Sequence, residues 1–106
     1  GFLMQAVQVD GRTLQYATQA LRADRKVVLA AVKQTGVALR FAQPALRADP
    51  EVALAAVRQD GLALEFALKP SEGVVMEAVR HNPSALRYAP EELRGSREFV
   101  LKAVEH

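Results

Sequence analysis

The sequence predicts an all-α fold, a helical-repeat solenoid in which units of about 25 residues each contain a longer helix, a short helix and a helical-turn link. Two observations lead to this prediction. An Ala-Val pair recurs at intervals of 25, 25, 22 and 25 residues, at Ala6-Val7, Ala31-Val32, Ala56-Val57, Ala78-Val79 and Ala103-Val104. Each of the first four pairs is followed three residues later by a helix-breaking step, then by a leucine and an aromatic-alanine pair.

The spacing of these features makes residues 1–106 one array, with units 1–23, 24–48, 49–70 and 71–95 and a partial unit 96–106. The longer helices are expected to begin at side chains that can accept a hydrogen bond from a first-turn N–H group: Asp24, Asp49, Ser71 and Ser96. They are expected to end at Asp10-Gly11, Thr35-Gly36, Asp60-Gly61 and Asn82-Pro83. Glycine can take the left-handed conformation past a helix end, and proline cannot continue the helix.

The short helix of each unit is predicted around a leucine and an aromatic residue, both expected in the core. The leucines are Leu14, Leu39, Leu64 and Leu86, and the aromatic residues are Tyr16, Phe41, Phe66 and Tyr88. The link that follows is three residues shorter between Ala67 and Ser71 than elsewhere. One helical turn should therefore be missing there, and the stack should bend or change pitch near the third and fourth units.

Equivalent positions of the longer helices indicate which faces are buried. Three sets stay apolar throughout: Phe2/Val27/Val52/Val74/Phe99, Met4/Leu29/Leu54/Met76/Leu101 and Val7/Val32/Val57/Val79/Val104. The invariant alanines of the Ala-Val pairs indicate a close approach between helices. A further set admits charge and should face water: Gln5/Ala30/Ala55/Glu77/Lys102. Helices this short are unstable alone, so each unit must pack on its neighbours, and apolar residues at Phe2 and from Phe99 to Val104 should promote self-association.

The recurring pattern is Ala-Val-x-x-[Asp/Thr]-Gly-x-[Ala/Thr]-Leu-x-[Phe/Tyr]-Ala followed by Leu-Arg-x-Asp. It is similar to an uncharacterised tandem repeat of bacterial and protist proteins, catalogued as a domain of unknown function, and the resemblance covers nearly the whole chain. The resemblance implies a helical array, often part of a longer protein. It brings no catalytic residue, cofactor or substrate.

Composition and motifs argue against an enzyme. The chain has no cysteine, which excludes disulfides, thiolate metal sites and a cysteine nucleophile, and its net charge is only +2. His81 is the only internal histidine, Ser71 and Ser96 are capping residues, and no acid-base pair is evident, so we expect no catalytic, cofactor or metal site. No long apolar run or signal peptide is visible, so a soluble, by default cytoplasmic, protein is expected.

The function predicted is a protein-protein interaction or scaffolding module within a larger protein, with an unknown protein partner. The alternative is binding of nucleic acid or another polyanion through ladders of basic residues. The candidate surface comprises Lys33, Arg58 and Arg80 after the Ala-Val pairs, Arg22, Arg47 and Arg94 in the links, and the outward Glu77 and Lys102. The basic residues could instead satisfy helix C-terminal carbonyls and bridge to acids such as Asp24 and Asp49.

Overall fold

In the computed structural model, which describes residues 11–105, the chain forms only helices and their connections, confirming the all-α prediction. Four are longer helices: α3 (Arg25–Gln34), α5 (Pro50–Gln59), α6 (Glu72–His81) and α8 (Arg97–Glu105). Four are 3-10 helices: η1 (Gly11–Tyr16), η2 (Gly36–Phe41), η3 (Gly61–Phe66) and η4 (Pro83–Tyr88). Three are short link helices: α2 (Gln19–Arg22), α4 (Pro44–Arg47) and α7 (Glu91–Arg94).

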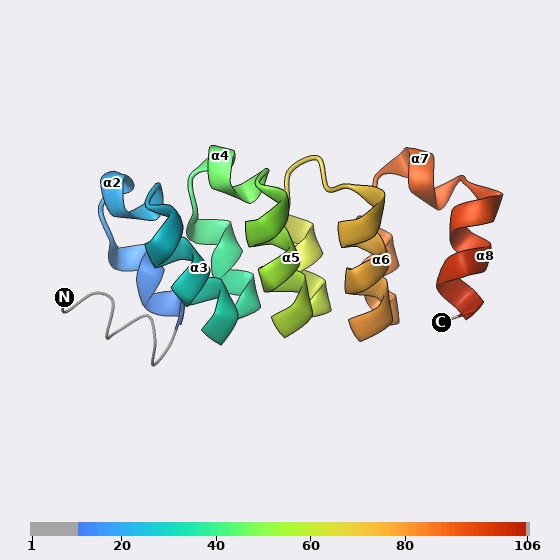
Figure 1. Cartoon of the computed structure of the whole chain (residues 1–106), viewed down its shortest axis with the longest axis horizontal. Coiled ribbons are helices and arrows are strands. Elements are labelled where there is room, and N and C mark those ends of the chain that lie inside the picture. The colour runs from blue at the N-terminus through green and yellow to red at the C-terminus, as the bar shows by residue number, and fades with distance from the viewer. Residues whose placement is uncertain (1–10, 106) are drawn as a thin grey trace.

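The units are arranged in a row, and the molecule measures 47 × 22 × 17 Å. The longer helices α3, α5 and α6 stand side by side, with the link helices along one edge of the row (Figure 1). Each of these three packs against the 3-10 helix before it and the one after it, and the 3-10 helices contact one another in turn. The core therefore lies between a layer of longer helices and a layer of 3-10 helices.

The predicted caps begin the longer helices. One carboxylate oxygen of Asp49 accepts hydrogen bonds from the N–H groups of Glu51 (2.9 Å) and Val52 (3.2 Å). Asp24 does the same for the first turn of α3, and Ser71 and Ser96 accept one bond each at α6 and α8. These interactions depend only on residues within one helical turn, which is why the sequence pattern identified them.

The expected left-handed glycines are a wrong prediction, because no described glycine has a positive φ. Helices α3, α5 and α6 end instead at an extended residue, as at Asp60, whose side chain accepts the N–H of Leu62 and starts the 3-10 helix. Gly61 is required by space: a Cβ there would lie 2.5 Å from the carbonyl oxygen of Ala78 in the next unit. Gly36 meets the carbonyl oxygen of Ala56 in the same way. Glycine at this step permits close packing between units.

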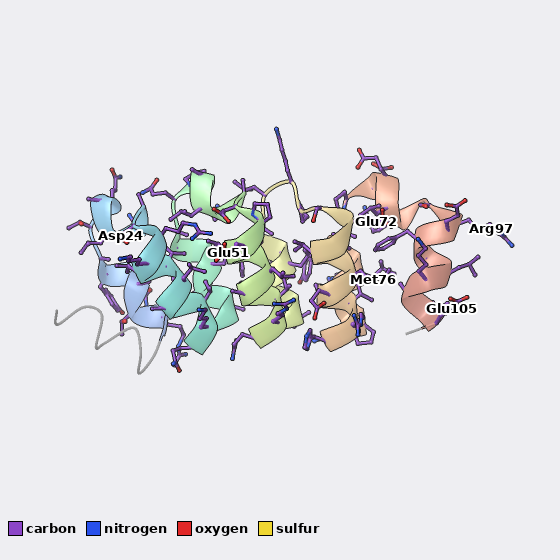
Figure 2. All side chains as sticks on the ribbon, viewed as in Figure 1. Asp24, Glu51, Glu72, Met76, Arg97 and Glu105 are labelled. Carbon is purple, nitrogen blue, oxygen red and sulfur yellow. The ribbon has the colours of Figure 1, made fainter. Side chains whose placement is uncertain are left out.

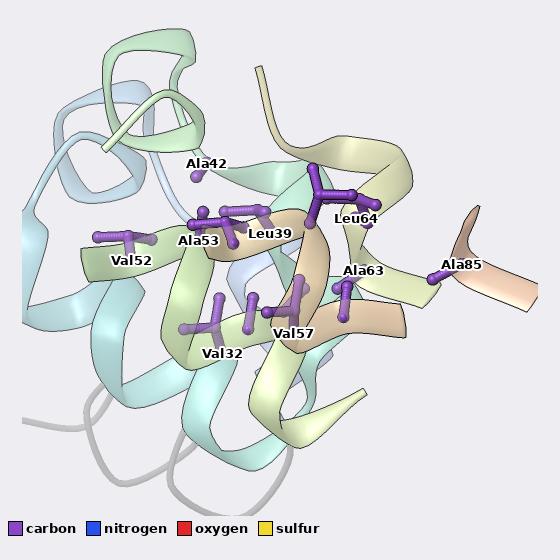
Figure 3. Close-up of a cluster of buried hydrophobic side chains, with 14 of the residues drawn as sticks. Val32, Leu39, Ala42, Val52, Ala53, Val57, Ala63, Leu64 and Ala85 are labelled. Atoms are coloured by element: carbon purple, nitrogen blue, oxygen red, sulfur yellow. The ribbon is translucent and has the colours of Figure 1, made fainter. Parts of the chain in front are cut away.

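Most of the expected apolar sets are buried in the described units, including the alanines and valines of the Ala-Val pairs in α3, α5 and α6. Figure 3 shows Val32, Leu39, Val57 and Leu64 meeting in this core. The set containing Leu29, Leu54 and Met76 is a correction: these side chains are only partly buried, and Leu101 is 43% exposed. The preceding positions are buried in their place: Val28, Ala53 and Val75. At about 100° per residue the buried residues of α3, at positions 27, 28, 31 and 32, fall within one stripe, and Leu29 lies about 60° beyond its edge.

The expected aromatic core also needs correction. Phe41, Phe66 and Tyr88 are partly buried at its margin, and Tyr16 is 82% exposed. In the set expected to face water, only Lys102 is exposed among the described members. Ala30, Ala55 and Glu77 are partly buried. Among the apolar residues expected to be uncovered, Phe99 is buried, at 2% exposure, and Val104 is 71% exposed. Phe2 and the other positions before residue 11 lie outside the described residues.

The short link behaves as predicted, since units one, two and four have a link helix and residues 67–71 have none. The chain turns there through Lys69, whose φ is +49°. The expected change of stacking is misplaced, however. Helices α5 and α6 pack together like α3 and α5, whereas α8 stands farther from α6 (Figure 1). The irregularity follows Pro83, which occupies the position of Gly36 and Gly61 and has a ring where those glycines make their close approach.

Candidate partner-binding face

The longer helices present one repeating surface, which we call the long-helix face. In each of α3, α5 and α6 a partly buried apolar residue is followed four positions later by an exposed basic residue: Leu29 and Lys33, Leu54 and Arg58, Met76 and Arg80. Residues four apart lie on the same side of a helix. Figure 2 labels Met76 on α6 and Glu51 on α5, the latter one turn before Leu54. The long-helix face therefore combines apolar and cationic side chains at a repeating interval.

Helices α5 and α6 flank an open hollow of about 400 Å³ on this face. Its walls are mainly apolar and come from both helices and the residues before them: Pro50, Glu51, Leu54, Arg58, Ser71, Gly73, Val74 and Glu77. Gly73 contributes no side chain, and a Cβ at that position would have only Ser71 Oγ within 4 Å, at 3.9 Å. Space for an incoming apolar side chain is thus left beside Leu54 and Val74.

A second hollow, of about 310 Å³, lies between α3 and α5. It has a different chemistry, because it is lined by Lys33, Ala55, Arg58 and Gln59. Arg58 lines both hollows, so the two adjoin. A third hollow, over α3, is lined by Lys26, Leu29, Ala30, Lys33 and Gln34. The face is accordingly basic over α3 and more apolar between α5 and α6.

Glu77 is the acidic centre of the face and lies near two arginines and a histidine. Its carboxylate oxygens are 3.8 Å from Arg58 Nε, 3.9 Å from Arg80 Nη1 and 3.2 Å from His81 Nε2. The Glu77 side chain is 23% exposed, whereas Arg58 and Arg80 are more than half exposed. Such partly solvated pairs contribute little to stability. Their importance is that a carboxylate occupies the space between two consecutive basic residues of the face.

Of the candidate surface residues, the structure brings together Lys33, Arg58, Arg80 and Glu77. Lys102 is exposed on α8, which stands apart from α6, and lines none of the three hollows. The link arginines do not form a common exposed ladder. Arg47 Nε donates a 2.8 Å hydrogen bond to the carbonyl oxygen of Phe66, while Arg94 is exposed.

The carbonyl oxygens of the link arginines also join successive units, because Arg22 O accepts the N–H of Gln43 and Arg47 O that of Leu68. The Arg22 Nε atom is buried and has no hydrogen-bond partner within residues 11–105. Among the link arginines, the expected side-chain contact to a carbonyl group is seen for Arg47, through its Nε atom. The expected bridges from them to Asp24 and Asp49 are absent from the described part of the chain.

Asp49 instead pairs with Arg25, which sequence reasoning missed. Arg25 Nε is 3.2 Å from Asp49, and Arg25 Nη2 is 2.6 Å from Glu51, so the start of α3 is tied to the start of α5. Hydrogen bonds from Arg25 to Glu51 and then to Asp49 raise the pKa of Arg25. Burial raises the pKa of Asp49, but hydrogen bonds from the Val52 N–H, Arg25 and the Glu51 N–H outweigh it and hold that pKa below its usual value.

The apolar members of the long-helix face were missed as well. Leu29, Leu54 and Met76 are apolar in every described unit, and a repeated apolar position indicates core. The signal that could have separated them is that the adjacent set Val28, Ala53 and Val75 is equally apolar. Helical phase then gives the signal: positions 27, 28, 31 and 32 form one stripe, and position 29 falls at its margin.

Residues 11–105 contain no group of three or more His, Asp or Glu side chains placed to hold a metal ion. No described helix is long and apolar enough to cross a membrane.

Comparison with family models matches the chain to the family described as "Domain of unknown function (DUF4116)", over residues 1–47, 24–69 and 71–106. The chain belongs to this family, and the repeated matches agree with its repeated architecture. Comparison with curated proteins and with solved structures gave no match.

Proposed function

We propose that this member of the DUF4116 family is a protein-interaction module and that its long-helix face binds a segment of a partner protein. The observation that carries the proposal is the repeated pairing of a half-buried apolar side chain with a basic one along three consecutive helices, with hollows between the helices. Grooves of this kind can take the side chains from one side of a bound segment, while the basic residues contact its polar groups. Stacked repeats extend such a surface along the array.

Several contacts favour a protein partner over a polyanion. Arg47 uses its guanidinium within the fold, and Glu77 places negative charge between Arg58 and Arg80. A nucleic acid would need uninterrupted cationic contacts to its phosphates, and its binding should weaken steeply with salt. Stacking of bases on the aromatic residues of the 3-10 helices is also obstructed. The Arg40 guanidinium lies 5.3 Å from the Phe41 ring centroid and 5.4 Å from that of Phe66.

A random peptide library displayed on phage provides a test that works without the partner's identity. Peptides selected on the wild-type protein should bind much more weakly to the double variant Leu54→Ser, Met76→Ser, because both substitutions remove apolar surface from the face. The matched control is Tyr16→Ser, which removes a large exposed side chain from η1, in the other layer. Circular dichroism establishes that each variant is folded.

Two results would refute the proposal. One is a set of selected peptides that bind the double variant as well as the wild type. The other is stronger binding to a mixed pool of single-stranded RNA and DNA than to any peptide, with an affinity that falls steeply as salt rises.

A further inference from the structure

Glu77 shows how the long-helix face holds a carboxylate. This side chain lies between Arg58 of the preceding helix and Arg80 of its own helix, at 3.8 and 3.9 Å. One unit earlier the corresponding cations are Lys33 and Arg58, and the residue in the position of Glu77 is Ala55. The two flanking cations are therefore repeated between α3 and α5 without the internal carboxylate, while His81, which lies 3.2 Å from Glu77, is replaced by Gln59.

The hollow between α3 and α5 occupies the place of that missing side chain. It is lined by Lys33, Ala55, Arg58 and Gln59. Within residues 11–105, Lys33 forms no ion pair, and Lys26, on the same face of α3, forms none either. Glu51, the nearest acidic residue of α5 on this face, is matched by Arg25 at 2.6 Å. Within the described chain Lys33 is thus left without an acidic partner, whereas Arg58, on the other side of the groove, also faces Glu77 at 3.8 Å.

We infer that the groove between α3 and α5 binds the side-chain carboxylate of an acidic, extended segment of the partner protein, held by Lys33 and Arg58 as Glu77 is held by Arg58 and Arg80. This inference rests on the proposed function and specifies the chemistry of its ligand. The Arg58 and Arg80 contacts to Glu77 are ion pairs at 3.8 and 3.9 Å, and a ligand carboxylate that is free to approach Lys33 and Arg58 more closely can accept charged hydrogen bonds, which are stronger. Ala55 leaves room for the incoming carboxylate where the next unit supplies its own.

The adjoining hollow between α5 and α6 receives an apolar side chain of the same segment. It shares Arg58 with the first hollow and is walled by Leu54 and Val74, with Gly73 leaving it open. Neighbouring helices pack about 8–10 Å apart, and a segment in the extended polyproline II conformation rises about 3.1 Å per residue with three residues per turn, so side chains three positions apart lie on the same side, about 9 Å apart. The acidic and apolar residues of the ligand should therefore be separated by about three positions in its sequence.

The same arrangement disfavours a phosphate backbone as the ligand. A nucleic acid carries one negative charge per nucleotide, so a strand that placed one phosphate at Lys33 and Arg58 would bring others towards Glu77 and Glu51. The groove between α5 and α6 is also mainly apolar. A single carboxylate with an apolar neighbour fits both hollows at once.

The decisive variants move the internal carboxylate. Ala55→Glu supplies the missing side chain to the α3–α5 groove and should close it, whereas Glu77→Ala should open a second carboxylate site between Arg58 and Arg80. The matched control is Ala45→Glu on the exposed link helix α4, where the corresponding position of α7 already holds Glu92. It makes the same chemical change and the same change in net charge away from the face.

The probes are synthetic peptides in a Gly-Ser background that carry one Glu and one Leu at separations of one to five positions. Binding is followed by shifts of backbone amide resonances in two-dimensional NMR, which detects weak complexes. We expect the tightest binding at a separation of about three, with shifts at Lys33, Ala55 and Arg58. Ala55→Glu should weaken binding by about tenfold or more, since it removes a charged contact, while Ala45→Glu leaves it unchanged. Glu77→Ala should strengthen binding of a peptide with a second Glu.

Each alternative outcome has a distinct meaning. The carboxylate inference is wrong if Gln replaces Glu in the peptide without loss of affinity, or if the Ala55→Glu variant binds peptides as well as the Ala45→Glu variant does. The proposed function then still stands provided that the double variant Leu54→Ser, Met76→Ser abolishes binding. If no peptide binding depends on either set of variants, both proposals fail. A third outcome is that pooled single-stranded RNA binds the wild type more tightly than every peptide does and no longer binds the Ala55→Glu variant. That result would identify a phosphate site and overturn the inference.

Discussion

Gly61, the first residue of η3, contacts the backbone of α6. A Cβ on Gly61 would lie 2.5 Å from the carbonyl oxygen of Ala78. Gly36 makes the same contact with α5. Gly73, within α6, has open space around its Cβ position. Glycine is therefore required at the first two positions by packing, and at the third it only removes a side chain from the hollow beside Leu54.

Substituting alanine at these glycines should give effects of opposite sign. Gly61→Ala places a methyl group 2.5 Å from a backbone oxygen that cannot move freely, and should destabilise the protein by about 1–3 kcal/mol. Gly73→Ala meets no such obstacle and should stabilise it by about 0.5–1 kcal/mol, because alanine loses less conformational freedom in a helix. Urea unfolding followed by circular dichroism measures both, and equal effects would contradict the packing role of Gly61.

Asp49 makes stability depend on pH through its lowered pKa. Because the folded-state pKa lies below the ordinary value of 3.8, the charged carboxylate stabilises the fold above that pH, and the contribution is lost as pH falls through the folded-state pKa. Asp49→Asn keeps an oxygen acceptor at the cap but removes the charge. We expect the variant to be less stable than wild type at pH 7 by up to about 1 kcal/mol, and the difference to shrink towards pH 2. A difference that stayed constant between these pH values in urea unfolding would exclude this origin.

At the scale of whole elements, local and non-local interactions differ in how well the sequence predicts them. The start of each longer helix was predictable because a cap such as Asp49 acts within its own turn. The tighter 3-10 form of the second helix was not predictable in this way. The residue types in that helix depend on contacts with the next unit, as at Gly36 and Gly61. The long-helix face shows the same limit: four of its charged residues were identified, but the half-buried Leu54 and Met76 have the pattern of core residues.

The link arginines offer a test of element-level contacts. Arg47 donates to the carbonyl oxygen of Phe66 and so joins α4 to η3 of the next unit, whereas Arg94 is exposed on α7. Arg47→Ala should therefore destabilise the fold by about 1–3 kcal/mol, since it leaves a carbonyl without its charged partner. Arg94→Ala should change stability by less than about 0.5 kcal/mol. Thermal melts of both variants suffice, and equal losses would show that the two arginines share one role after all.

The whole molecule behaves as a row in which stability depends on neighbours. α5 is flanked by α3 and α6 and by 3-10 helices on both sides, and its Val52, Ala56 and Val57 are fully buried. α8, which follows Pro83 in the chain, packs against α7 and only loosely against α6. In stacked repeats the stability of a unit is the sum of its own contribution and its interfaces. The centre of the row should therefore be the most stable part.

Hydrogen exchange measured by mass spectrometry can resolve this gradient. Amides of α5 should exchange most slowly and those of α8 fastest among the four longer helices, because opening α8 breaks the fewest interfaces. Val57→Ala, at a fully buried position, should cost about 2 kcal/mol and speed exchange in α3 and α6 as well as in α5. Val104→Ala, at a position that is 71% exposed, should leave exchange outside α8 unchanged. If Val57→Ala altered α5 alone, the units would be folding independently, and the coupling inferred from their shared core would be wrong.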